Sequence, residues 1–181
     1  LYLTRQGDDV LASCRLTISL SDPRLGSIGE VATVPEHRGK GLAKKLCRWA
    51  AEDFDKAGGE ALFLATGNPA AAKLYTHLGW RSLVNSAAML RVKEGALAEE
   101  FMADYFRSGA GREVQIVRGG AAQRVPIVPL ILSPHDWVIL DANTSILSLR
   151  YFYQQSCEGL YTRYEALNEP GKWFAATRND G

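Results

Sequence analysis

The stretch Thr33-Val-Pro-Glu-His-Arg38-Gly-Lys-Gly41-Leu-Ala43-Lys-Lys45 decides how the first half of this chain is organised. An apolar segment ends where it begins, a proline turns the chain, and two glycines precede a segment of helical period. Glycines at such a junction let backbone N–H groups approach an anion closely, and the helix dipole favours negative charge there. The stretch therefore predicts a strand, a turn and an anion-binding helix N-terminus.

The charges of the following helix support an anion site. Basic side chains crowd its first turns and acidic ones lie near its end: Lys40, Lys44, Lys45 and Arg48, then Glu52, Asp53 and Asp55. This order is the reverse of what the helix dipole prefers, and a bound polyanion would offset the cost. A solvated basic face is the alternative interpretation. The pattern lacks the third glycine of a dinucleotide-binding fingerprint and the Gly-x-x-x-x-Gly-Lys-Ser/Thr of a phosphate loop.

Strand and helix periods alternate around this stretch. We expect strands over 10–20 and 27–34 to pair as a hairpin, followed by a helix over 39–57. A buried strand over 61–65 should then lie parallel to its predecessor, and a helix should extend from Pro69 to Gly79. Two further strands, over 80–84 and 86–92, should be joined near Asn85. On the first helix, a core face is predicted from Leu42, Leu46, Trp49, Ala50 and Phe54. This order predicts an α/β class, of the α+β type with a mixed sheet.

Two motifs in this region resemble signatures of one family. Arg38-Gly-Lys-Gly41-Leu-Ala43 resembles the Arg/Gln-x-x-Gly-x-Gly/Ala signature of the GNAT N-acetyltransferases. Asn68-Pro-Ala-Ala-Ala-Lys-Leu-Tyr75-Thr-His-Leu-Gly79-Trp80 resembles that family's second signature, Asn-x-x-Ala-x-x-x-Tyr-x-x-x-Gly-Phe/Trp. Both occur in the family's order, which is more specific than either alone. The resemblance covers residues 1–93 and implies a GNAT-like core that lacks the family's first strand and two helices.

The resemblance also implies acetyl-CoA as the acyl donor and a role for each matching residue. Backbone groups of Val31, Ala32 and Thr33 would hold the pantetheine arm and the acetyl carbonyl, where the strands over 27–34 and 61–65 splay apart. The residues expected to hold the pyrophosphate are consecutive: Arg38, Gly39, Lys40, Gly41, Leu42, Ala43 and Lys44. Asn68 would contact the cofactor, and Tyr75 would be the general acid for the leaving thiolate. Taken without the family, Tyr75 also fits an ordinary core position beside Leu74 and Leu78.

The general base is where the sequence departs from the family. Phe63 stands where some members have a glutamate, and Glu30 is the acid on the earlier strand. Glu30 is therefore the candidate base, but strand alternation can turn it away from the splayed strands, as an exposed edge glutamate. Deprotonation relayed through water by backbone carbonyls stays open as well. His37 and His77 are interpreted as surface residues.

Residues 94–181 are expected to form a C-terminal α+β extension beyond the 1–93 core. The patterns predict a helix over 96–107, strands over 113–118 and 173–177, and an edge or irregular strand over 125–132 because of its two prolines. The extension is interpreted as a second acyltransferase-like half or as a cover for the acceptor side. Its aromatic residues suit a pocket wall or a core: Trp137, Tyr151, Tyr153, Tyr161, Tyr164 and Trp173. The adjacent His135 and Asp136 are a weak catalytic signal.

Composition argues against several classes of protein. Apolar residues make up 46% of the 181 residues, enough for a sizeable core. Twenty-one basic against twenty acidic residues argue against nonspecific nucleic-acid binding, and no apolar stretch is long enough to span a membrane. Cys14, Cys47 and Cys157 show no metal-ligand spacing and no disulfide framework, which favours a reducing, cytoplasmic compartment and no metal. The chain begins at Leu1, as expected of a piece of a longer protein.

These observations predict an acetyl-CoA-dependent N-acetyltransferase. It would transfer the acetyl group to a primary amine, on a small molecule or a lysine side chain, by direct attack of the amine on the thioester. A second hypothesis is an acyl-CoA-binding or regulatory module without turnover, motivated by the missing base. A third is a structural domain whose glycine loop only starts a helix, which requires both motif matches to be chance. The sequence leaves a homodimer open.

Overall fold

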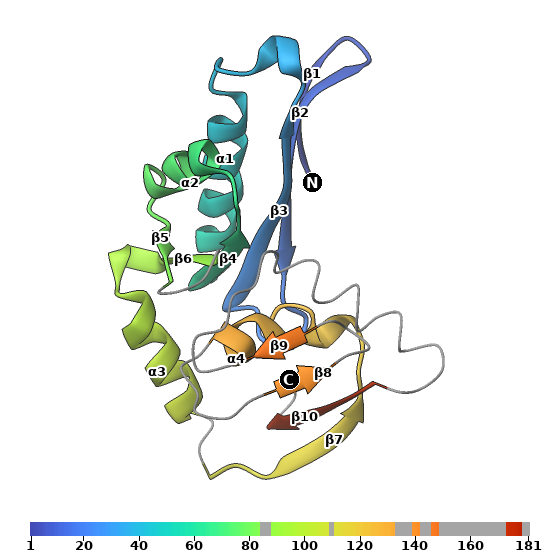
Figure 1. Cartoon of the computed structure of the whole chain (residues 1–181), viewed down its shortest axis with the longest axis vertical. Helices are drawn as coiled ribbons and strands as arrows, with labels where there is room; N and C mark the ends of the chain where they lie inside the picture. Colours follow the sequence, from blue (N-terminus) through green and yellow to red (C-terminus); the bar gives the residue numbers. More distant parts are fainter. Residues whose placement is uncertain (84–87, 109–110, 133–138, 142–145, 149–172, 179–181) are drawn as a thin grey trace.

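The computed structural model describes residues 1–83, 88–108, 111–132, 139–141, 146–148 and 173–178. The first part of the chain forms one mixed sheet with two helices (Figure 1). Its elements are β1 (Tyr2–Gln6), β2 (Asp9–Ile18), β3 (Leu25–Thr33), α1 (Leu42–Lys56), β4 (Ala61–Ala65), α2 (Pro69–Thr76), β5 (Arg81–Ser82) and β6 (Ala88–Val92). The strand order is β1-β2-β3-β4-β6-β5, so the α/β class with a mixed sheet is confirmed.

Most pairings in this sheet follow the prediction. β2 and β3 form the antiparallel hairpin, and β4 is parallel to β3. β6 pairs antiparallel with both β4 and β5. The structure adds β1, which the sequence patterns did not predict because Tyr2 and Leu3 are followed by three polar residues without alternation. The turn expected near Asn85 lies outside the described residues.

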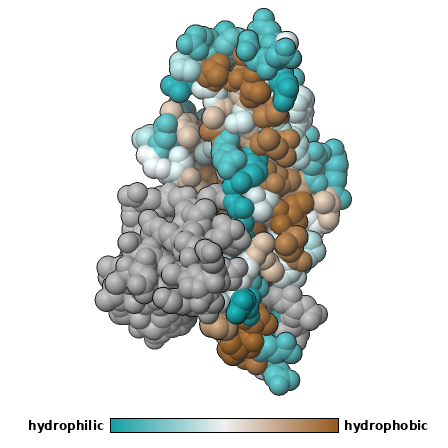
Figure 2. Space-filling model, turned by 90° about the vertical axis from the view of Figure 1, so that its right-hand side faces the viewer, coloured by the Kyte–Doolittle hydropathy of each residue, from teal (hydrophilic) through white to brown (hydrophobic). Residues whose placement is uncertain are grey.

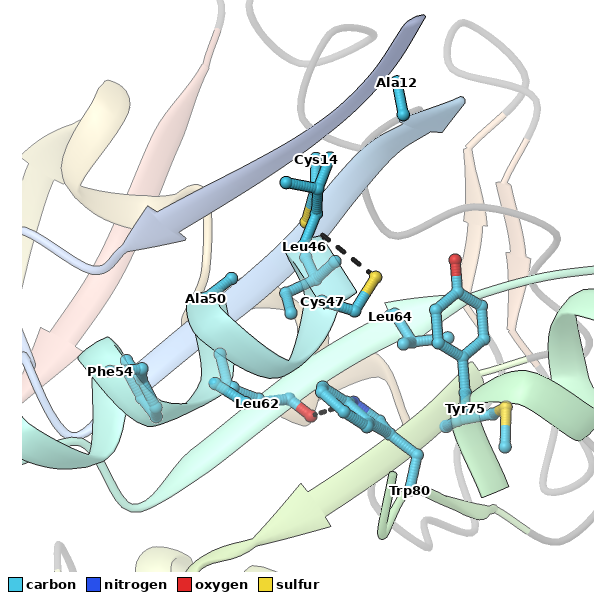
Figure 3. Packing of buried hydrophobic residues seen from close by; sticks show 13 residues of the cluster. Ala12, Cys14, Leu46, Cys47, Ala50, Phe54, Leu62, Leu64, Tyr75 and Trp80 are labelled. Carbon is cyan, nitrogen blue, oxygen red and sulfur yellow. Dashed lines mark hydrogen bonds between the residues drawn. The ribbon is translucent and has the colours of Figure 1, made fainter. Parts of the chain in front are cut away.

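One face of the sheet is covered by α1 and α2 (Figure 1). The core between them contains Leu46, Ala50 and Phe54 from α1, together with Leu62 and Leu64 from β4 (Figure 3). Trp49, which we expected in this core, is 44% exposed instead. It lies at the margin of the apolar stripe, where Lys45 Nζ lies 4.6 Å from the centre of its ring.

The other face of the sheet is partly covered by residues that follow the 1–93 core. Leu25 and Phe63 pack there against Ala98 and Met102 of α3 (Ala98–Ser108) and against residues around α4 (Ile127–Leu132). The helix expected over 96–107 is confirmed. Residues on both sides of position 93 thus share one hydrophobic cluster, while the division of the chain at residue 93 stays a prediction.

The prediction of a strand over 125–132 is wrong. Residues Ala121–Gln123 form a 3-10 helix and Ile127–Leu132 form α4. Both prolines suit a helix start: Pro126 precedes α4, and Pro129 lies in the first turn, where backbone N–H groups have no intrahelical acceptor. Val125 and Val128, three residues apart, are both buried.

The remaining described strands form two small antiparallel pairs. β7 (Val114–Arg118) pairs with β10 (Phe174–Arg178), which confirms both strands expected there. β8 (Ile139–Asp141) pairs with β9 (Ile146–Ser148). The other residues singled out in the extension lie outside the described residues: His135, Asp136, Trp137, Tyr151, Tyr153, Cys157, Tyr161 and Tyr164.

Seen from the side of β1–β3 that is turned away from α1, the molecule shows apolar patches interrupted by hydrophilic side chains (Figure 2). Several large apolar residues of the chain are well exposed, among them Leu1, Leu20 and Ile116. Within the described part of the chain, no helix has the length and hydropathy needed to cross a membrane.

Candidate active site

Among the residues that the structure describes, no side chain satisfies the N-terminus of α1. Gly41 precedes the helix in a left-handed conformation with φ 78°, and no side chain caps the helix. The first turn contains no acidic residue. Because the first N–H groups of a helix have no intrahelical acceptor, those of Leu42, Ala43 and Lys44 are open to an external anion.

The loop before α1 leaves room for such an anion. Gly39 and Gly41 both have positive φ, 76° and 78°, and apart from their chain neighbours no heavy atom of the described residues lies within 4 Å of where a Cβ would stand at either position. A side chain in this left-handed conformation costs about 1–2 kcal/mol. The loop therefore combines a backbone conformation suited to glycine with open space beside the helix start, which fits a pyrophosphate.

Exposed cations surround this loop. Arg38 donates a hydrogen bond from Nε to the backbone oxygen of Thr33 at 3.1 Å, which holds its guanidinium against the end of β3. Lys40 and Lys44 are exposed on either side of Gly41. The guanidinium retains further N–H donors that can bind phosphate. The residues predicted to hold the pyrophosphate thus surround one uncapped helix start.

The acids at the far end of α1 have partners of their own. Asp55 forms a two-pronged ion pair with Arg91 of β6, at 2.7 and 2.8 Å. Asp53 accepts a hydrogen bond from the Tyr2 hydroxyl at 2.9 Å. These contacts give two of the three acids near the end of α1, Asp53 and Asp55, partners within the protein. The basic end has no comparable acidic partner among the described residues, which favours a bound anion there.

β3 and β4 part soon after they begin to pair. Their parallel ladder extends from Leu25 and Ala61 to Ser27 and Phe63, and beyond Ser27 no described strand pairs with this edge of β3. The Val34 N–H donates to the Leu11 oxygen of β2 at 3.0 Å.

Strand alternation then fixes which backbone groups are available along the open edge. Because Val34 is hydrogen-bonded to β2, Val31 and Thr33 direct their N–H and C=O groups to the open edge, whereas Ala32 faces Ser13 on β2. The predicted backbone site is thereby narrowed to Val31 and Thr33.

α2 begins with a complete cap, as its sequence predicts. The Asn68 side chain accepts hydrogen bonds from the N–H groups of Ala70 at 2.9 Å and Ala71 at 3.4 Å. Pro69 occupies the first helical position. Within the described part of the chain these hydrogen bonds use the amide oxygen of Asn68, which leaves its NH₂ group available to donate to a ligand.

Tyr75 is held in place at the end of α2. It is 7% exposed, and its ring centre lies 6.0 Å from that of Trp80. Trp80 is itself fixed by a hydrogen bond from Nε1 to the backbone oxygen of Leu62 at 3.0 Å (Figure 3). The Tyr75 hydroxyl points away from Trp80 toward the end of β4 near Leu64 (Figure 3). Tyrosine is protonated at neutral pH, and burial raises the pKa of Tyr75 further.

Glu30 stands on β3 directly before Val31, and its carboxylate has a partner. Arg15 Nη1 lies 3.0 Å from Glu30 Oε1, and the Glu30 side chain is 57% exposed. Glu30 also has a left-handed backbone with φ 51°, which costs about 1–3 kcal/mol for a residue other than glycine. The structure thus shows an exposed glutamate in an ion pair, which is the second of the two sequence interpretations.

Two cysteines that are distant in sequence meet beside Tyr75. The Cys47 thiol of α1 donates to Cys14 Sγ of β2 at 3.9 Å, and both residues are fully buried (Figure 3). This hydrogen bond, together with burial, raises the pKa of Cys47. Buried thiols in apolar surroundings are inert, so we assign the pair to the core.

Sequence reasoning overlooked residues that support the site from β2. Ser13 donates from Oγ to the backbone oxygen of Glu30 at 2.9 Å, and Arg15 binds the same residue's carboxylate. Neither lies in a recognisable motif, and the only available signal was their spacing of two on one strand face. His77 is exposed, with Nδ1 2.6 Å from the Lys73 oxygen, as expected of a surface residue.

Comparison with known proteins addresses the first half of the chain. Residues 1–80 match the family model described as the acetyltransferase (GNAT) family. No curated protein matches the sequence.

Among solved structures, PH1933 from Pyrococcus horikoshii OT3 is 19% identical, with 51% of this chain and 64% of that chain covered and a TM-score of 0.44. Nourseothricin acetyltransferase is 21% identical, with 48% and 59% covered and a TM-score of 0.41. YhbS from Escherichia coli, a GNAT family N-acetyltransferase in complex with CoA, is 18% identical, with 49% and 55% covered and a TM-score of 0.39.

The chain spans less than two thirds of the length of each of these three structures. The family match extends from the start of the chain through both motifs, to Trp80. Residues 1–80, including both motifs, are therefore similar to the GNAT acetyltransferase family.

Proposed function

We propose that this chain is an N-acetyltransferase that transfers the acetyl group of acetyl-CoA to a primary amine. The amine, on a small molecule or a lysine side chain, would attack the thioester directly. The observation that carries the proposal is the uncapped, acid-free N-terminus of α1, which lies next in the chain to a strand whose edge is open. Together these supply an anion site and a row of backbone hydrogen-bonding groups.

The chain's own groups divide the binding between them. The N–H groups of Leu42, Ala43 and Lys44 bind the pyrophosphate, with Arg38 and Lys40 supplying positive charge. Gly39 and Gly41 let the phosphates approach the backbone. Val31 and Thr33 bind the pantetheine arm along the open edge of β3, and the Asn68 amide donates from the start of α2.

The same residues support acyl transfer. Acetyl-CoA supplies the acetyl group as a thioester. A backbone N–H of β3 stabilises the negative charge that develops on the acetyl oxygen, which is a large contribution in acyl-transfer enzymes. The Tyr75 hydroxyl, which is protonated at neutral pH, donates to the leaving sulfur. The Tyr75–Trp80 contact and the Trp80 hydrogen bond hold that hydroxyl in position.

The amine must also lose a proton, and two routes follow from the sequence and the fold. In the first, Glu30 accepts the proton as general base. In the second, water molecules held by the backbone carbonyls of the open edge carry the proton to bulk solvent. Arg15 Nη1 lies 3.0 Å from Glu30 Oε1 and engages the carboxylate in an ion pair, which favours the water route.

A second candidate function is acyl-CoA binding without turnover. The same Arg15–Glu30 pair motivates it, because it removes the one acidic side chain of β3 from proton transfer. The two functions share the binding site and differ only in acetyl transfer. Release of free CoA that depends on an added amine would exclude the binding-only function.

Calorimetric titration with acetyl-CoA tests the proposal, with ATP as a control for phosphate binding alone. We expect micromolar affinity for acetyl-CoA in the native chain, and loss of binding when Arg38→Glu and Gly41→Glu are combined. An amine panel, assayed for CoA release, then measures turnover. Equal binding of acetyl-CoA by the native chain and the double variant would overturn the assigned site.

A further inference from the structure

An extra residue is inserted in β3 directly before the proposed site. Between the pairs Ser13–Ala32 and Arg15–Gly29, β2 advances by two residues and β3 by three. The left-handed residue of this bulge is Glu30, with φ 51°. Bulges with a left-handed residue usually place glycine there, so this bulge is held by something other than the intrinsic preference of its residue.

The contacts that hold it come from the neighbouring strand. Ser13 Oγ donates to the backbone oxygen of Glu30 at 2.9 Å, and Arg15 Nη1 lies 3.0 Å from the Glu30 carboxylate. Ser13 and Arg15 flank the buried Cys14 on β2 and therefore share the face opposite to it. One residue of β3 is thus held by its backbone and by its side chain at once.

The bulge determines to which face of the sheet each following residue of β3 points. Ile28 and Val31 both pack toward the α1 cluster although they are three positions apart, whereas in a regular strand residues two apart share a face. A one-residue change of register would turn Val31 and Thr33 to the opposite face and exchange the edges to which their backbone groups point. The bulge therefore determines which N–H groups line the open edge.

We infer that Ser13 and Arg15 are positioning residues for acetyl-CoA binding, because they hold Glu30 in its left-handed conformation and so keep Val31 and Thr33 directed at the open edge of β3. This inference rests on the proposed function. It also gives Glu30 a role through its backbone, in place of proton transfer by its carboxylate.

The test combines single variants of Ser13 and Arg15 with a Glu30→Gly background, in which their contacts with residue 30 are not needed. Ser13→Ala and Arg15→Met each weaken acetyl-CoA binding about three- to tenfold, and Ser13→Thr and Arg15→Lys restore most of it. Glycine adopts the left-handed conformation freely, so Glu30→Gly binds acetyl-CoA like the native chain, and adding Ser13→Ala to it has no further effect. Thr17→Ala, on the same face of β2, is the matched control and leaves binding unchanged.

A second readout separates this role from that of a general base. Glu30→Gly removes the carboxylate and also the need for the contacts from β2, so its turnover number and pH profile, measured with acetyl-CoA saturating, distinguish the two roles. Loss of turnover and of the basic limb of that profile in Glu30→Gly and Glu30→Gln alike, with affinity unchanged, would overturn the inference and assign the base to Glu30. If Ser13→Ala and Arg15→Met lower only the melting temperature while acetyl-CoA binding stays native, the contacts of Ser13 and Arg15 serve stability only. The inference then fails, while the proposed function stands. Absence of binding by the native chain would instead overturn the proposed function, and the inference with it.

Discussion

The helices α1 and α2 both begin just after a strand of the same sheet, but their N-termini are built differently. At α2, Asn68 accepts hydrogen bonds from the N–H groups of Ala70 and Ala71. At α1, the corresponding position is Gly41, with no side-chain cap and no acid in the first turn. α3 resembles neither, because Glu99 and Glu100 supply negative charge to its first turn.

The difference shows which helix start is complete by itself. A side-chain cap contributes about 1 kcal/mol, so its absence at α1 is a cost to the folded protein. The lysines around Gly41 add to that cost, since positive charge is unfavourable at a helix N-terminus. Both costs are offset if an anion binds there. We therefore expect the N-terminus of α1 to bind an anion and the capped N-terminus of α2 to need none. Experiments can test this difference.

The largest expected effect comes from supplying α1 with the negative charge it lacks. Ala43→Glu places a carboxylate at the second helical position, where it competes with the pyrophosphate for the same N–H groups. We expect acetyl-CoA affinity to fall about a hundredfold, or about 2.7 kcal/mol, while the helix itself gains about 0.3–1 kcal/mol of stability. Calorimetric titration and urea unfolding measure the two quantities.

Ala70→Glu is the matched control, because Ala70 is the second helical position of α2. We expect the same small gain in stability and less than about a threefold change in acetyl-CoA affinity. Equal losses of affinity in both variants would show that the two helix starts do not differ in the way proposed.

The next effect concerns catalysis from α2. Tyr75→Phe removes the hydroxyl but keeps the ring against Trp80. The turnover number should fall about 10–100-fold, toward the lower end of what a positioned acid contributes, and acetyl-CoA affinity should stay native. Single-turnover assays and titration separate these quantities. An unchanged turnover number would leave Tyr75 as a core residue only.

Removing the special residue at each helix start gives smaller effects. Gly41→Ala should cost about 1–2 kcal/mol of unfolding free energy from left-handed strain, and Asn68→Ala about 1 kcal/mol from the lost cap. Gly41→Asn should restore part of the first loss, because asparagine tolerates this conformation. Thermal unfolding with and without acetyl-CoA measures these changes, and Gly41→Ala should lose the greater share of the stabilisation by ligand.

Salt should act on one helix start and hardly on the other. The exposed cations around Gly41 are screened as ionic strength rises, so raising salt from 0.05 to 0.5 M should weaken acetyl-CoA binding by roughly three- to tenfold. The unfolding free energy of Asn68→Ala relative to the native chain should not change with salt. A salt-independent affinity would contradict an electrostatic site at α1.

The smallest effect probes the opposite end of α1, where the acids have protein partners. Burial and the hydrogen bond to Asp53 raise the pKa of Tyr2 to about 12. Because the folded pKa lies above the unfolded value, this contribution to stability is present below pH 10 and is lost as pH rises toward 12. Tyr2→Phe should therefore lose less stability than the native chain as pH rises from 10 toward 12 in urea unfolding, and identical slopes would refute the contact.

Local signals predicted much of the fold and of the candidate site. The glycines around Arg38, the Asn68 cap and the apolar run of β4 each depend on their own residues and near neighbours. The bulge at Glu30 could not be predicted, because it depends on Ser13 and Arg15 on another strand. The prediction for the segment around Pro126 failed for a related reason. Prolines oppose a regular strand and also suit a helix start, and packing against α3 and the sheet decides between the two.

Hydrogen–deuterium exchange with and without acetyl-CoA tests the contrast between the two helix starts most directly. Leu42, Ala43 and Lys44 have N–H groups without intrahelical acceptors, whereas Ala70 and Ala71 are already bonded to Asn68. We predict that acetyl-CoA slows exchange at 42–44 and at Val31 and Thr33, and leaves Ala70 and Ala71 unchanged. Binding of acetyl-CoA without any slowing at 42–44 would contradict the account.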